Sequence, residues 1–192
     1  MSAENKIGAK VRQLREAKEM SIEQLAEQSQ CHADQIRQIE DGALVPSLTP
    51  LMELSRALGV RLGTFMDDEP VDGPAVFDSS EAPSVIRFSG KDPKATSSSL
   101  DFYSMAANKK DRHMEPFMID VKPRSGDAPP LSGHEGEEFI YVLEGAIQIN
   151  YGKTTYELEA GQSIYYDSIV PHDVHAKGDQ TAKILAVVYA PC

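Results

Sequence analysis

The 192-residue sequence has little cysteine, no tryptophan and no long apolar run. Its two cysteines, Cys31 and Cys192, lie far apart, so the sequence offers neither a disulfide framework nor a cysteine metal motif. No apolar stretch approaches the roughly 20 residues of a membrane span, and the first residues lack the apolar core of a signal peptide. A basic excess is also absent, because the net charge is −11, which argues against a membrane surface or bulk RNA as a partner. We therefore expect a soluble, cytoplasmic protein.

The first third of the chain has the pattern of short helices. Apolar residues recur at helical spacing at Ile7, Val11 and Leu14. Ser21 precedes a second helix as its N-cap, and a third predicted helix ends at Gly42. Short helices joined by a tight turn inside a compact bundle are typical of the helix-turn-helix design.

The stretch from Met20 to Val60 resembles the repressor-like helix-turn-helix of the XRE regulator family. The matching residues are Leu25, Ala26, Ile36, Ile39, Glu40, Gly42, Pro46, Ser47, Leu48, Leu51, Leu54, Ala57, Leu58 and Gly59. The resemblance implies that residues 33–40 form a recognition helix for the major groove of double-stranded DNA. The contacting residues would be Ala33, Asp34, Gln35, Arg37 and Gln38.

Two properties of this segment bear on DNA binding. Gln38 and Asp34 would face base edges, because an amide pairs with adenine and a carboxylate accepts from cytosine. Acidic residues outnumber basic ones up to Asp67, so affinity for DNA of any sequence should be weak, and a homodimer on a pseudo-palindromic operator would compensate. The alternative is that the bundle serves only as an interaction or dimerisation domain.

The rest of the chain is expected to be all-β. Residues 68–83 are acidic and rich in proline and serine, which is typical of a linker. Beyond them, short apolar runs alternate with turn residues, which predicts a sandwich or barrel. We therefore expect an α + β protein of two domains, with an all-α helix-turn-helix bundle over residues 1–67, a linker over 68–83 and an all-β domain over 84–192.

Three potential metal ligands lie in the all-β part. His134 and Glu138 are four residues apart, just before the apolar strand 139–143, and His172 follows a second apolar strand over 163–166. Imidazole and carboxylate ligands suit Zn, Fe, Mn or Ni. If the two strands are neighbours, the three side chains converge on a divalent metal. The alternative is a vestigial site, in which the histidines line an organic-ligand pocket through hydrogen bonds and the glutamate pairs with a basic group.

From Gly126 onward the chain resembles the cupin family. The first motif of that family maps onto Gly126, Ser132, His134, Glu138 and Gly145, and the second maps onto Gly161 and His172. Ser132 stands where the family has a first histidine. The resemblance implies a cupin barrel, also called a double-stranded β-helix or jelly roll, that binds a metal through His134, Glu138 and His172. Residues expected to line its ligand pocket are Tyr103, Ser132, Tyr141 and Tyr166.

This combination of domains indicates two possible functions. The architecture resembles that of XRE–cupin transcription regulators, in which a small-molecule effector or metal changes the placement of two DNA-reading domains. The alternative is a non-haem iron oxygenase or epoxidase resembling hydroxypropylphosphonate epoxidase, whose histidine, glutamate and histidine ligands also match. In that resemblance Glu19 replaces a lysine that reaches the phosphonate, which argues against phosphonate chemistry. We expect a regulator rather than an enzyme, with a dimer formed by strands 85–88 and 146–151.

Overall fold

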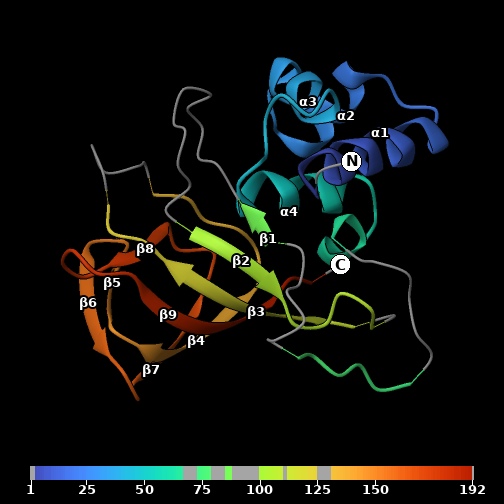
Figure 1. Ribbon diagram of the computed structural model, residues 1–192. Coiled ribbons are helices and arrows are strands. Elements are labelled where there is room, and N and C mark those ends of the chain that lie inside the picture. Colours follow the sequence, from blue (N-terminus) through green and yellow to red (C-terminus); the bar gives the residue numbers. More distant parts are fainter. Residues whose placement is uncertain are drawn as a thin grey trace.

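The computed structural model describes residues 3–66, 73–78, 85–87, 100–109, 112–124 and 131–191. Most of the expected linker over 68–83 lies outside these ranges. The chain forms a helical N-terminal part and a β-rich C-terminal part, which confirms the expected fold class (Figure 1). No helix in the described ranges is both long and apolar enough to cross a membrane.

The helical part consists of short segments around one apolar core. Their bounds are Ala3–Ala17 for α1, Ile22–Ser29 for α2, Ala33–Glu40 for α3, Leu48–Ala57 for α4 and Leu62–Phe65 for the 3₁₀-helix η1. Ser21 caps α2 through the backbone N–H of Gln24, whose side chain bonds back to Ser21. Val11, Leu25 and Ile36 are fully buried, so α1, α2 and α3 each contribute to the same core.

An ion-pair cluster fixes α3 to α1. Glu40, at the end of α3, is buried and accepts hydrogen bonds from Arg15 at 2.7 and 2.8 Å and from Arg12 at 3.3 Å. Arg12 also donates to Asp41 at 2.6 Å. Two basic residues that the sequence might offer to DNA are therefore bound within the domain.

The β part is built from two antiparallel sheets. The strands are β1 (Val85–Arg87), β2 (Leu100–Ser104), β3 (Met114–Val121), β4 (Glu137–Glu144), β5 (Ala146–Tyr151), β6 (Thr154–Glu159), β7 (Ser163–Asp167), β8 (His172–Ala176) and β9 (Ala182–Tyr189). A six-stranded sheet has the order β1-β2-β3-β9-β4-β7, and a three-stranded sheet has the order β6-β5-β8. This is the arrangement expected of a jelly roll.

Strand alternation divides each sheet into an inner and an outer face. Along β4, Glu138, Ile140 and Val142 are buried, whereas Tyr141 and Leu143 are exposed. Buried residues of β3 and β9 stand opposite the buried residues of their neighbours, so one continuous face of the six-stranded sheet covers the core. Glu138 is a charged residue on this inner face.

The helical part contacts the barrel directly. Thr49 of α4 donates to the hydroxyl of Ser132 at 3.2 Å, and Arg56 of α4 forms an ion pair with Glu135 at 2.8 Å. The backbone N–H of Gly63 in η1 donates to the carboxylate of Glu115 at 3.0 Å. A methyl group at position 63 would overlap the ends of the Arg112 and Glu115 side chains and would displace this buried ion pair.

Candidate metal centre between the barrel and the helical domain

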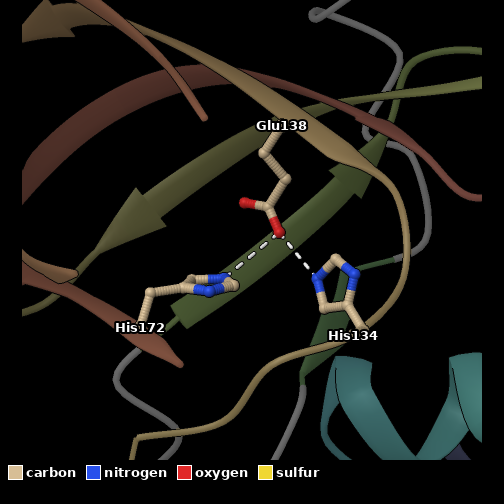
Figure 2. Close-up of side chains that lie close together, drawn as sticks. All are labelled: His134, Glu138 and His172. Carbon is tan, nitrogen blue, oxygen red and sulfur yellow. Dashed lines mark hydrogen bonds and ion pairs between the residues drawn. The ribbon is translucent and has the colours of Figure 1, made fainter. Parts of the chain in front are cut away.

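Three side chains from separate segments of the β part meet inside the barrel. Glu138 lies on β4, His134 lies in the loop before β4, and His172 begins β8. The loop that carries His134 is held against the second sheet, because Ser132 and His172 exchange backbone hydrogen bonds at 3.2 and 2.9 Å. Figure 2 shows the three side chains pointing toward one another.

The geometry of this cluster suits a metal ion. The Oε1 atom of Glu138 lies 2.7 Å from Nε2 of His134 and 3.3 Å from Nε2 of His172. All three ligand atoms lie within 4.8 Å of one another, and all three residues are buried. Ligands bound at about 2.1 Å to a tetrahedral or octahedral metal are separated by about 3 Å. Both distances to Glu138 are close to this value.

The hydrogen bond that Nδ1 of each histidine makes determines which ring nitrogen carries a hydrogen and which one faces the centre. Nδ1 of His134 bonds to the backbone carbonyl of Glu135 at 3.1 Å, and Nδ1 of His172 bonds to that of Val170 at 2.9 Å. A carbonyl oxygen can only accept, so both Nδ1 atoms carry the hydrogen. In a neutral imidazole this leaves the Nε2 lone pair directed at the carboxylate. Two lone pairs and a buried carboxylate repel one another unless a cation, either a metal or a proton, lies between them.

Two hydroxyl groups hold the carboxylate of Glu138. Tyr166 donates to Oε2 at 2.7 Å, and Ser168 donates to Oε1 at 3.3 Å. Burial by itself raises the pKa of Glu138, but the two histidines, which donate from Nε2 when that atom carries a proton, outweigh it and hold this pKa well below its usual value. Burial and the charge of Glu138 raise the pKa of Tyr166, so its hydroxyl stays protonated and donates. Glu138 is therefore an ionised, oriented ligand.

The loop between the first two ligands depends on glycine. Gly136 has φ +113°, a value that residues with a side chain rarely adopt. A methyl group at this position would overlap the backbone carbonyl oxygen of Tyr189. This loop thus packs against the end of β9, which fixes the separation between His134 and Glu138.

A pocket of about 250 Å³, which we name the junction pocket, lies between the metal centre and the helical part. Gly133, His134 and Glu135 line its barrel side, and Met52 and Arg56 of α4 line its helical side. The helix beside His134 at the lower right of Figure 2 has the colour of α4. A molecule in this pocket would contact both a candidate ligand of the metal and a helix of the N-terminal domain.

The charges of the junction pocket are balanced by neighbouring groups. Arg112 and Glu115 form a buried ion pair at 2.7 Å, and Arg56 is paired with Glu135. Arg61 donates to the backbone carbonyl of Arg112 at 3.1 Å. The pocket therefore has mainly apolar walls that also carry charged groups, without a strong excess of either charge.

Of the four tyrosine and serine residues expected in the ligand pocket, Tyr166 lies at the metal centre and Ser132 pairs with the backbone of His172 beside it. Tyr166 contacts Glu138, and its ring centroid lies 5.0 Å from that of His172. Ser132 lies at the mouth of the barrel, where its hydroxyl accepts from Thr49. The serine that replaces a histidine of the cupin motif thus contacts the helical domain.

The other two expected pocket residues lie elsewhere, which corrects the prediction. Tyr141 is 37% exposed and lies on the face of β4 opposite Glu138. Tyr103 stands opposite Met118 of β3, on the outer face, and donates to Asp120 at 3.2 Å. Both belong to strands in which the two faces carry apolar residues, so the sequence pattern did not reveal the inner face.

Basic side chains that lie near the candidate metal ligands in sequence are dispersed in the structure. Arg112 lines the junction pocket, but Arg124 forms an ion pair with Asp173 on the outer face of the three-stranded sheet. Lys110 lies outside the described residues. The sequence analysis missed Arg56 and Ser168, for which no spacing signal exists, because only the folded chain brings them to Glu135 and Glu138.

The residues expected to contact DNA lie on one helix. Asp34, Arg37 and Gln38 are exposed on α3, whereas Ala33 and Gln35 are half-buried. In Figure 1, α3 lies at the side of the helical part away from the strands. Arg37 is held by carboxylates, since it donates to Asp34 at 2.7 Å and to Glu23 of α2 at 2.5 Å.

Comparison with known families agrees with both parts of the structure. A family model described as a helix-turn-helix domain matches residues 6–64, and one described as a cupin domain matches residues 117–188. The chain joins an XRE-like helix-turn-helix domain to a cupin domain. The expectation drawn from the sequence resemblances is confirmed for both domains.

Similar proteins include an enzyme and a regulator. The (S)-2-hydroxypropylphosphonic acid epoxidase of Streptomyces wedmorensis is 29% identical over 153 residues, which cover 73% of each chain. An HTH_3 family transcriptional regulator from Vibrio cholerae has a TM-score of 0.69 over 98% of this chain and 97% of that chain, but at 18% identity it shows the fold alone.

A second solved structure bears on the metal. The structure of Fe(II)-HppE with the alternative substrate (S)-1-HPP has a TM-score of 0.52 and 25% identity, over 98% of this chain and 100% of that chain. Together with the cupin domain and the cluster of His134, Glu138 and His172, this similarity supports a divalent metal such as iron.

Proposed function

We propose that this protein is a sequence-specific, DNA-binding transcription regulator whose cupin domain senses a small-molecule effector, a divalent metal or both. The observation that carries the proposal is the junction pocket, which has His134 on one wall and helix α4 of the DNA-binding domain on the other. Occupancy of a site with walls from both domains changes the energy of their relative placement. A sensor requires this coupling, whereas an enzyme can work without it.

In this proposal α3 reads DNA through Ala33, Asp34, Gln35, Arg37 and Gln38. The exposed amide of Gln38 pairs with adenine, and the exposed carboxylate of Asp34 accepts a hydrogen bond from cytosine. The Arg37 guanidinium exchanges its carboxylate partners for a phosphate, an exchange favoured by their exposure to solvent. Because the domain has no basic excess, two copies on two half-sites supply the affinity.

The metal site supplies the second part of the mechanism. His134, Glu138 and His172 would hold a divalent ion, which supplies open coordination positions for an oxygen-bearing effector when bound. Tyr166 and Ser168 orient Glu138, and the two backbone carbonyls orient the histidines. An effector that enters through the junction pocket alters the contacts of Arg56 and Thr49 with the barrel, and α4 transmits the change to the α2–α3 unit.

The alternative function is a non-haem iron oxygenase. The epoxidase relative and the two-histidine, one-carboxylate set favour it, because that set suits Fe(II) with open positions. Phosphonate turnover is disfavoured, since Arg112 beside the pocket is buried in an ion pair with Glu115 and Arg61 donates to a backbone carbonyl. An oxygenase acting on another substrate remains the competing proposal.

Footprinting on the DNA upstream of the protein's own gene tests whether the protein is a sequence-specific regulator. We expect one protected site with two half-sites about 10 base pairs apart, centre to centre. Gln38→Ala should weaken binding about tenfold or more, in line with the roughly 1–3 kcal/mol of one bidentate base contact. Gln13→Ala, at an exposed position on α1, is the matched control and should bind like the unmodified protein. Absence of a specific site, together with oxygen-dependent turnover of a metabolite by the iron-loaded protein, would favour the oxygenase.

A further inference from the structure

The junction pocket adjoins the metal centre but does not open onto its ligand atoms. Among the described residues that line the pocket, His134 alone is also a candidate metal ligand. Its Nε2 atom faces Glu138 at 2.7 Å, and its Nδ1 atom bonds to the backbone carbonyl of Glu135. In Figure 2 the helix with the colour of α4 lies on the side of His134 away from Glu138. A molecule in the pocket can therefore bind without coordinating the metal.

The size and walls of the pocket limit what it can hold. Its volume of about 250 Å³ is below the roughly 300–1,000 Å³ of sites for drug-sized ligands. Met52 and Leu62 of the helical part and Ile169 of the barrel supply apolar wall. Ile169 is 63% exposed, so it has apolar surface left for a bound molecule to cover. The ligand is therefore small and has an apolar portion.

The charged groups of the walls determine the net charge of the ligand. Three carboxylates and three guanidinium groups line the pocket among the described residues: Glu53, Glu115, Glu135, Arg56, Arg61 and Arg112. A molecule with a net charge would leave one of these signs in excess inside a partly enclosed site, which is costly. The pocket therefore favours a ligand whose net charge is zero.

One ion pair crosses the pocket and can accept new partners. Arg56 of α4 meets Glu135 of the barrel at 2.8 Å, and their side chains are 48% and 56% exposed. Exposed pairs of this kind contribute little to stability, so they exchange partners readily. A carboxylate alone would bind Arg56 but leave Glu135 without a partner, and an amine alone would do the reverse. Only a molecule with both groups replaces both partners.

We infer that the junction pocket binds an α-amino acid with an apolar side chain. The carboxylate binds Arg56, the ammonium group binds Glu135, and the side chain packs against the apolar wall. Insertion replaces one direct contact between α4 and the barrel by two contacts through the ligand. It also separates Thr49 from Ser132, whose hydroxyls lie 3.2 Å apart. The role of this ligand as an effector rests on the proposed function, whereas its binding does not.

Isothermal titration calorimetry on the full chain tests the ligand class, with L-leucine as the first probe. Isocaproate lacks the ammonium group, isopentylamine lacks the carboxylate, and isocaproamide carries neither charge. L-leucine should bind at least about tenfold more tightly than each of these analogues, since it alone satisfies both partners. The inference is overturned if an analogue binds as tightly as L-leucine. It is also overturned if L-leucine, L-methionine and L-phenylalanine all fail to bind at millimolar concentration.

Substitution of the ion pair tests the location. Arg56→Gln and Glu135→Gln should each weaken L-leucine binding about tenfold or more, and both positions are exposed, so the variants should fold. Glu157→Gln is the matched control, because Glu157 is 52% exposed and pairs with Lys177 at 2.6 Å on the other sheet. It should bind L-leucine like the unmodified protein. Unchanged affinity in Arg56→Gln and Glu135→Gln would refute the assigned site.

Two further measurements separate this inference from its alternatives. Amino acids also chelate metals, so protein dialysed against a chelator should bind L-leucine as tightly as before. Loss of binding together with the metal would place the amino acid on the metal and overturn the inference. Footprinting with and without L-leucine tests the effector role. Operator binding by a protein that does not bind L-leucine would refute this inference alone, and L-leucine binding by a protein without an operator would refute the proposed function alone.

Discussion

Removal of the hydroxyl group of Tyr166 should weaken metal binding without unfolding the barrel. In Tyr166→Phe the ring remains against His172, whose centroid lies 5.0 Å away, and only the oxygen that donates to Glu138 at 2.7 Å is lost. The carboxylate keeps the hydroxyl of Ser168 on Oε1 at 3.3 Å, but Oε2 loses its hydroxyl donor, which formed the shorter of the two bonds. Glu138 then turns more freely away from the orientation that faces the histidines.

The expected magnitude follows from the strength of a hydrogen bond to a buried charge. Such a bond contributes about 1.5–3 kcal/mol, and loss of an outer partner of a metal ligand lowers metal affinity about 10–100-fold. A tenfold change in affinity equals about 1.4 kcal/mol, so the two figures agree. We therefore expect the dissociation constant for Fe(II) to rise about 10–100-fold and the free energy of unfolding to fall by about 1–3 kcal/mol.

Neighbouring residues provide a matched control for this experiment. Tyr165 stands next to Tyr166 and donates to Glu137 as Tyr166 donates to Glu138, but it does so on the exposed face of the sheet. Tyr165→Phe should leave Fe(II) affinity unchanged. Affinity is measured by anaerobic competition with a colorimetric chelator, and stability by urea denaturation. If Tyr166→Phe binds Fe(II) as tightly as the unmodified protein, the carboxylate does not depend on this hydroxyl and the reasoning is refuted.

Three further predictions concern the metal ligands and the fold. His134→Ala and His172→Ala should each remove most of the bound metal found by elemental analysis, and unchanged metal content would exclude them as ligands. Gly136→Ala should lower the free energy of unfolding by at least about 2 kcal/mol and weaken metal binding, because the new methyl group would sit at a positive φ and overlap the backbone of Tyr189. A variant as stable as the unmodified protein would contradict the loop geometry. Glu40→Ala should destabilise the chain by roughly 3 kcal/mol, because it leaves the largely buried guanidinium group of Arg15 without its partner. Asp41→Ala removes the exposed partner of Arg12 and should lower the free energy of unfolding by less than about 1 kcal/mol in the same denaturation experiment. Equal losses in the two variants would show that burial of the carboxylate does not determine its contribution to stability.

The sequence by itself determined the elements of the fold and the chemical character of the site. Apolar spacing, the N-cap at Ser21 and the stop at Gly42 are local signals, and the helices follow them closely. The identity of the candidate ligands also follows from residue type and spacing, because His134 and Glu138 adjoin a strand that any barrel would bury. Local interactions therefore specify where elements begin and end, and which atoms are available for coordination.

Only the tertiary structure decided which face of each strand lies inside and which residues meet. In β4 the residues at 139, 141 and 143 are as apolar as those at 140 and 142, so alternation alone could not place Tyr141 on the outer face. The convergence of His172 on Glu138 depends on β8 lying beside β5 and on the bridge to Ser132, contacts between residues far apart in sequence. The junction pocket arises in the same way, because long-range pairing energy, rather than local propensity, selects one packing of the strands and helices.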